Sequence, residues 1–170
     1  YCKLYRSRYL QRRAANLAAD KPVTFNIAPS KGYAKFGAKA LTDGLYGGTT
    51  FVESWVGWEG INADFVVDLG EECDIHSVSI DCLHQLGAWI LLPKGVKYSV
   101  STDGTNYTPL GEYYRPEDRD PSVKFVEFKV EKAARARYVR AEVEGTIECP
   151  SWHYGVGHAS WFFIDEIVVN

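Results

Sequence analysis

The 170-residue sequence predicts an all-β domain, an antiparallel β-sandwich or jelly roll. Three observations predict this fold class. Apolar and polar residues alternate in six or more segments, as they do in strands with one buried face. Aromatic residues make up 14% of the chain and glycines number 15, a combination that suits short strands joined by shaped loops. Helical periodicity is confined to one segment near the N-terminus.

The first expected element is this helical segment, residues 3–19, in which apolar and basic side chains recur every three or four residues. Its predicted end comes before Pro22, because the residue that precedes a proline is disfavoured in helical geometry. We expect residues 1–15 to be a helical connector from a preceding domain and residues 16–170 to be the sandwich module. The chain does not begin with Met, and we interpret it as part of a longer protein.

From residue 23 onward, the alternation has a period of two and predicts a succession of strands. The alternating sets fall at residues 65–69, 78–82, 96–100, 126–130, 139–143 and 162–169. Four long loops rich in Trp, His and charged residues lie at residues 43–62, 83–93, 111–121 and 145–161. Because the binding residues of such a scaffold are usually carried by its loops, we look for function there.

The charge distribution limits the classes of function. The chain has a net charge of −3, but residues 1–14 hold five basic and no acidic side chains. The remaining residues therefore contain 14 basic and 22 acidic side chains, a charge of −8. Such an acidic body argues against nucleic acid and membrane surfaces as partners, and no apolar run approaches the roughly 20 residues of a membrane helix. The four cysteines lack zinc-site spacing, and we expect buried thiols.

A family resemblance rests on six short segments in chain order: residues 16–23, 40–44, 64–70, 98–104, 136–140 and 164–167. Together they resemble the discoidin family, also called coagulation factor C-type domains. The carbohydrate-binding relatives of this family are the family 32 carbohydrate-binding modules. The resemblance implies a jelly roll with a bound calcium ion, and its ligand can be a sugar, a lipid or a protein.

A narrower resemblance rests on residues 55–60, 89–93 and 150–161. These segments resemble the C-terminal module of bacterial family 20 glycoside hydrolases, which are β-hexosaminidases and chitobiases. The resemblance implies an accessory module of a bacterial enzyme that is secreted, periplasmic or located at the outer membrane or cell surface. We expect a monomer whose partners are a glycan and the catalytic domain of its own chain.

The glycine-rich sequence DGLYGGTT at residues 43–50 suits a structural calcium site, because glycines let backbone carbonyl oxygens turn inward towards a cation. By resemblance to the family, the ligands would be the carbonyl oxygens of Ala40, Leu45 and Asp165, the side chains of Asp43 and Glu166, and the hydroxyl of Thr50 or Thr49. Leu45 departs from the family pattern, which often has an acidic residue there. The alternative is that Asp43 only caps a turn.

The candidate sugar-binding residues are aromatic and polar side chains of the loops. A sugar ring presents an apolar C–H face and a rim of hydroxyls, which flat aromatic rings and polar side chains complement. The candidates are Trp58, His84, Gln85, Trp89, Trp152 and His153. They form one site only if their loops converge at one end of the sandwich. For Trp55, Trp89 and Trp161, which adjoin apolar residues, the alternative is a place in the core.

Asp165 and Glu166 are adjacent, as are the catalytic Asp and Glu of family 20 hydrolases. Neighbouring side chains of a strand point to opposite faces unless a β-bulge intervenes, and the hydrolase pair belongs to a barrel of roughly 250 residues. We therefore expect no catalysis from this chain. The first hypothesis is a non-catalytic module that binds hexosamine- or galactose-containing glycans. The second is a structural module that packs on the catalytic domain of its parent enzyme without binding sugar.

Overall fold

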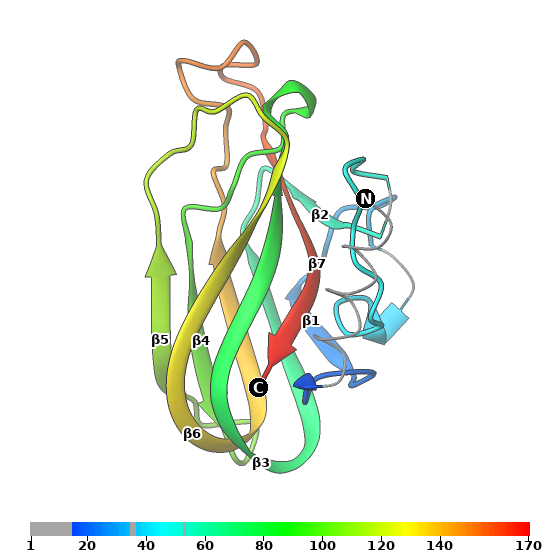
Figure 1. Ribbon diagram of the computed structural model, residues 1–170, viewed down its shortest axis with the longest axis vertical. Coiled ribbons are helices and arrows are strands. Elements are labelled where there is room, and N and C mark those ends of the chain that lie inside the picture. The colour runs from blue at the N-terminus through cyan, green and yellow to red at the C-terminus, as the bar shows by residue number, and fades with distance from the viewer. Residues whose placement is uncertain (1–14, 35–36, 53) are drawn as a thin grey trace.

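The computed structural model describes residues 15–34, 37–52 and 54–170 (Figure 1). The strands of these residues are β1 (Val23–Ile27), β2 (Val56–Glu59), β3 (Ala63–His84), β4 (Gly95–Ser101), β5 (Thr108–Tyr114), β6 (Lys124–Glu144) and β7 (Trp161–Val169). Two short 3-10 turns, Gly37–Lys39 and Leu86–Ala88, lie in the loops. All but the last residue of the expected connector at residues 1–15 lies outside the described residues.

The strands pair antiparallel and form two layers that share β3 and β6. In one layer, the first half of β3 pairs with β1 and with the second half of β6, and β4 and β5 follow. In the other layer, the second half of β3 lies between the first half of β6 and β7, and β2 pairs with β7. The predicted antiparallel β-sandwich is confirmed.

The two shared strands are longer than the alternation suggests. The predicted segments 65–69 and 78–82 are halves of β3, which has 22 residues, and 126–130 and 139–143 are halves of β6, which has 21. The pairing of β3 with β6 shifts register twice between residues 68 and 77, and Gly70 there has a φ of +86°. Such irregularities let a strand bend from one layer into the other without ending.

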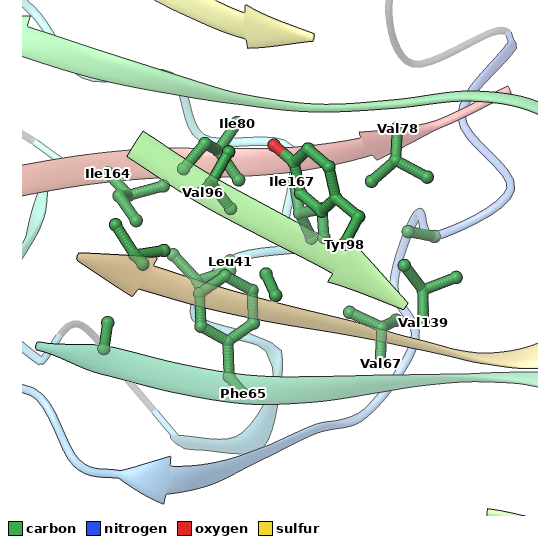
Figure 2. Packing of buried hydrophobic residues seen from close by; sticks show 14 of the residues in the cluster. Leu41, Phe65, Val67, Val78, Ile80, Val96, Tyr98, Val139, Ile164 and Ile167 are labelled. Carbon is green, nitrogen blue, oxygen red and sulfur yellow. The ribbon is translucent and has the colours of Figure 1, made fainter. Parts of the chain in front are cut away.

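The main core lies between the two layers (Figure 2). Its fully buried side chains come from both halves of the shared strands and from their neighbours. They include Phe65, Ile80, Val139, Ile164 and Ile167. Tyr98 adds a polar group, but its hydroxyl donates to the carbonyl oxygen of Phe128 at 2.7 Å, so the buried ring leaves no unsatisfied donor.

Two arginines of the segment 136–140 hold β6 to β3. Arg140 forms two hydrogen bonds with the carboxylate of Asp64, at 3.0 and 2.7 Å, and Arg137 forms two with Asp68, at 2.8 and 3.0 Å. The hydrogen bonds from these guanidinium groups lower the pKa of both carboxyl groups. These arginines therefore connect strands of one layer.

The chain enters the sandwich through a turn. Helical periodicity predicted a helix as far as residue 19, but residues 17–20 form a turn and Asp20 has a φ of 59°. Asn16 gives the physical reason, because its amide group donates to the carbonyl oxygen of Ile167 and accepts from the N–H of Val169. These bonds tie the segment to β7 instead. In the part of the chain that is described, no helix is long and apolar enough to cross a membrane.

The cysteines of the described residues carry free thiols. Cys82 and Cys149 are buried, as predicted, whereas Cys73 is half-buried. Burial raises the pKa of the Cys82 thiol well above its ordinary value, so the thiol stays protonated and unreactive at neutral pH.

Candidate functional site

Three loops meet at one end of the sandwich, at residues 85–94, 115–123 and 145–160 (Figure 1). The hydroxyl of Tyr154 in the third loop donates to the carbonyl oxygen of Gly87 in the first, at 2.6 Å. The indole N–H of Trp152 donates to a carboxylate oxygen of Glu117 in the second, at 2.9 Å. Two of the predicted loops, those at residues 83–93 and 145–161, therefore contact each other, and the loop after β5, which the predicted site lacked, joins them.

A groove of about 280 Å³ runs between these loops. Its walls come from residues 91–94, 114–118, Thr146, Pro150 and Trp152. The lining combines leucine, proline and tryptophan side chains with four charged ones, those of Lys94, Arg115, Glu117 and Asp118. This combination of an apolar surface with a few polar groups is typical of a site for a small ligand.

Trp152 is the one predicted sugar-binding residue that lines the groove. Its ring is half-buried, and the guanidinium carbon of Arg119 lies 5.2 Å from the ring centroid. Arg119 also forms an ion pair with Glu117, which accepts the indole N–H. The indole is thus held by a cation on one face and by a hydrogen bond at its edge.

A half-buried charge network supports the loop at residues 115–124. Arg115 and Lys124 both bind the carboxylate of Asp118, at 3.2 and 2.7 Å. Burial alone would raise the pKa of Asp118, but the hydrogen bond from Lys124 and the backbone N–H of Asp120 outweigh it and lower the pKa. Asp118 therefore remains ionised and keeps Arg115 against the groove wall.

His84 and His153 were predicted to contact sugar, and the structure places both in the packing. His153 is 5% exposed; its Nδ1 accepts the N–H of Gly155, so its Nε2 carries the proton and donates to the carbonyl oxygen of Leu86 at 2.8 Å. His84 is 1% exposed, and its Nε2 bonds the carbonyl oxygen of Asp120 at 2.7 Å. Their ring nitrogens hold the loops together, so the structure places neither residue in the groove.

Trp58 is also a core residue and not a platform for sugar. It has no exposed surface, stacks on Phe162 with ring centroids 5.3 Å apart, and donates its indole N–H to the carbonyl oxygen of Ile27. Trp58 lies on an inward position of β2, so the structure does not place it at the candidate site. Trp55 is buried, as the core alternative expected.

The remaining candidates lie close to the groove without lining it. Gln85 is half-buried and pairs with Ile90 in an isolated β-bridge. Trp89 is half-buried and packs against the rings of Tyr154 and His158. The core alternative for Trp89 is therefore only partly correct.

The predicted site lacked the groove residues at the end of β5 and directly after it. They are Tyr114, Arg115, Pro116, Glu117 and Asp118. A signal was present, since the loop at residues 111–121 is rich in charged and aromatic side chains. The spacing along the chain did not reveal that this loop lies against Trp152.

The loop at residues 40–50, which carries most of the predicted calcium ligands, contacts β7, which carries the other two, Asp165 and Glu166. The N–H of Gly44 donates to a carboxylate oxygen of Glu166 at 3.2 Å, and the N–H of Gly47 donates to Asp165 at 3.1 Å. Both carboxylates are 1% exposed. One loop therefore binds two adjacent acidic side chains of the same strand.

A β-bulge in β7 makes this arrangement possible. Ile80 of β3 pairs with Ile167, but Cys82, two residues further on, pairs with Ile164, three residues away in β7. The extra residue turns neighbouring side chains towards the same side. Neighbouring side chains of a regular strand point to opposite faces, and the bulge is why those of Asp165 and Glu166 do not.

The donor atoms of this region fit calcium in type. Asp43 is half-buried, Ala40 is buried, and Leu45, Thr49 and Thr50 are exposed. A carboxylate oxygen of Asp43 accepts the N–H of Leu45 at 2.9 Å, so the turn-capping alternative describes an interaction that is present. Among the described residues, no group of three or more His, Cys, Asp or Glu side chains is placed to hold a metal. The predicted ligands would instead combine the carboxylates of Asp43 and Glu166 with backbone carbonyl oxygens, and calcium accepts both kinds of ligand.

A family model described as F5/8 type C domain matches residues 26–163. Similar solved structures include chitosan-binding module 1 of a chitosanase/glucanase from Paenibacillus sp. IK-5, which is 21% identical with a TM-score of 0.53 and covers 91% of this chain and 98% of that chain. The module CpGH89CBM32-6 of Clostridium perfringens is 17% identical with a TM-score of 0.53, at 91% and 98% coverage. A Ruminococcus gnavus GH29 fucosidase is 15% identical with a TM-score of 0.58, and the match covers 94% of this chain and 27% of that chain. No curated protein sequence matches the chain.

At these identities, the likeness to solved structures shows the sandwich fold and no more. The family match is stronger, because it covers most of the chain, from β1 to β7. It confirms the resemblance that the six short segments indicated. The chain belongs to the F5/8 type C domain family, that is, the discoidin family.

Proposed function

We propose that this domain is a non-catalytic carbohydrate-binding module of a glycan-active enzyme, and that the groove beside Trp152 is its binding site. One observation carries the proposal. An indole ring lines an apolar groove at the loop end of the sandwich, with Arg119 and Glu117 fixing its position. The indole offers a surface for the C–H face of a sugar, and the charged residues of the groove offer partners for its hydroxyls.

The similar structures support a glycan as the class of ligand. One is named a chitosan-binding module, one is a Clostridium perfringens module in complex with GalNAc-β-1,3-galactose, and one is the CBM32 of AlyQ in complex with an unsaturated mannuronic acid. Because these ligands differ, they support the class and leave the individual sugar to experiment. The finer proposal is a hexosamine- or galactose-containing glycan.

The parent enzyme is proposed from the narrower sequence resemblance. It is a bacterial family 20 hydrolase, a β-hexosaminidase or chitobiase, located outside the cell, in the periplasm or at the cell surface. The domain itself contributes no catalysis, because Asp165 and Glu166 are buried and bound to the loop at residues 44–47. Its role is to hold the catalytic domain close to glycan.

Binding is tested on a glycan array, followed by calorimetry. Wild-type protein should bind hexosamine- or galactose-containing glycans, and Trp152→Ala should weaken binding about tenfold because it removes the apolar face. Tyr113→Ala is the matched control, since Tyr113 is 36% exposed on β5 and lies outside the groove. Binding that survives Trp152→Ala would keep the function and remove the groove as its site.

A structural accessory role is the second candidate function. It is favoured by the placement of His84, His153 and Trp58, which all serve packing and leave fewer polar groups for a sugar. In this case the domain packs on the catalytic domain of its parent chain and binds no glycan. Absence of binding to N-acetylhexosamine, galactose and sialylated glycans on the array would favour this role.

We also propose a structural calcium ion between the loop at residues 40–50 and β7, with the ligands inferred from the family. A ligand that binds only the folded state stabilises it by about 2.7 kcal/mol at 100 times its dissociation constant. Saturating calcium should therefore raise the melting temperature of metal-stripped protein by roughly 5–10 °C. Differential scanning calorimetry with and without a chelator measures this shift.

Asp43→Asn tests the calcium ligand set. The amide oxygen of asparagine can still accept the N–H of Leu45, so the turn is kept while a negative charge is lost. We expect this variant to lose most of the calcium-dependent shift, whereas Glu148→Ala, an exposed acid in another loop, should keep it. Equal melting temperatures of the wild type with calcium and with chelator would refute the site.

A further inference from the structure

A second aromatic surface lies near the groove, and the loop at residues 149–158 contributes side chains to both. We call it the aromatic ridge; it consists of Trp89, Tyr154 and His158. The ring centroids of Tyr154 and His158 lie 6.0 and 5.4 Å from that of Trp89. Tyr154 is 70% exposed, and His158 is also exposed. The ridge therefore presents aromatic surface to solvent at the same end of the molecule as the groove.

Tyr154 is held in one orientation despite its exposure. Its hydroxyl donates to the carbonyl oxygen of Gly87 at 2.6 Å. One face of its ring stacks on His153, with centroids 4.6 Å apart and an angle of 25° between the planes. Because His153 is itself fixed by two hydrogen bonds, the tyrosine ring has a rigid support although Tyr154 is largely exposed.

Gly155 allows the two loops of the ridge to approach each other. A Cβ atom at this position would lie 2.9 Å from Cε2 of Trp89, which is closer than packed atoms tolerate. A larger residue would push the loop away from Trp89. Close packing therefore holds the ridge together and keeps its aromatic side chains in place.

A rigid, exposed aromatic face is suited to binding. Ordering a side chain on binding costs free energy, and a ring already held in place avoids most of that cost. Its flat apolar face matches the C–H face of a pyranose, as does that of Trp152. The rings of Trp152 and Trp89 lie 6.0 and 6.5 Å from the ring of His153, so the groove and the ridge flank one buried residue.

We propose that the aromatic ridge is a second contact surface for glycan, and that the ligand is an extended polysaccharide which contacts groove and ridge with different sugar units. This inference rests on the proposed function and specifies its substrate class. The charge of −8 carried by the chain after residue 14 favours an uncharged or amino-sugar polysaccharide over a polyanion. Chitosan oligosaccharides, which are cationic, are therefore suitable probes.

Calorimetry with a disaccharide, a tetrasaccharide and a hexasaccharide of glucosamine tests the proposal. Wild-type protein should bind the hexasaccharide about tenfold more tightly than the disaccharide, because only the longer chain reaches both surfaces. Tyr154→Ala should remove this gain and leave disaccharide affinity within about twofold. Tyr154→Phe keeps the ring and should retain most of the gain. Tyr113→Ala is the control for loss of an aromatic side chain elsewhere, and melting temperatures confirm that each variant is folded.

The possible outcomes separate this inference from the proposed function. Equal affinity for short and long oligomers, or a chain-length gain that survives Tyr154→Ala, would overturn the ridge and leave the module intact. Binding to other glycans of the array but to no glucosamine oligomer would refute the proposed class of polysaccharide and leave the carbohydrate-binding function standing. Absence of binding to every glycan would refute the carbohydrate-binding function, and the inference with it.

Discussion

Replacing Trp58 by alanine should lower the free energy of unfolding by about 3–5 kcal/mol. The side chain is fully buried and stacks between Phe65 and Phe162, with centroid distances of 6.3 and 5.3 Å. Its loss leaves a cavity in the core and deprives the carbonyl oxygen of Ile27 of its donor. Urea denaturation followed by far-UV circular dichroism measures the change.

Trp152→Ala is the matched control for this experiment, because it removes the same side chain from a half-buried position in the groove. We expect it to cost less than about 1 kcal/mol of stability but to weaken glycan binding. Trp58→Ala should show the opposite pattern, with low stability and unchanged affinity of the folded fraction. A Trp58→Ala protein as stable as the wild type would contradict the core assignment.

His153→Ala should lower stability by about 2–4 kcal/mol and should also abolish glycan binding. The imidazole satisfies the carbonyl oxygen of Leu86 and the N–H of Gly155, and both groups lose their partner in the variant. The ring also supports Tyr154 and contacts Trp152 edge-on, at 4.6 and 6.0 Å between centroids. Under the proposed function, we expect His153 to position the contact residues without touching the ligand.

His76→Ala is the control for His153→Ala, since His76 is exposed on β3. Its stability and affinity should stay within experimental error of the wild type. Denaturation and calorimetry at a temperature where both variants are folded separate the two effects. Full glycan affinity in folded His153→Ala would show that the loop keeps its shape without the imidazole.

The alternation of residues along the chain predicted the strands well, because one face of each strand is buried for most of its length. Phe65 and Val67 in β3, and Val139 and Ala141 in β6, are fully buried as the pattern requires. The alternation could not show that β3 and β6 continue through their bends. At a bend, both faces of the strand are exposed to solvent, so apolar and polar residues no longer alternate although the backbone stays paired.

The candidate site was harder to predict, because residue type does not reveal depth. Trp58 and Trp152 are both tryptophans with glycines close by in the sequence, yet Trp58 is fully buried and Trp152 lines a groove. The difference depends on which loop lies opposite, and Glu117 and Trp152 are 35 residues apart in the sequence. Tyr154 was missed for the same reason, since its support comes from Gly87 in another loop.

The sharing of β3 by both layers has a kinetic consequence. The second half of β3 has β7 as its neighbour on one side, and β7 is the last strand of the chain. Asn16 also bonds Val169, so the earliest described residues depend on the latest ones. Closing such distant contacts costs chain entropy before any packing compensates it, which slows folding. During synthesis, one edge of β3 stays unpaired until the final strand emerges, and in that interval the chain is most prone to associate with other chains.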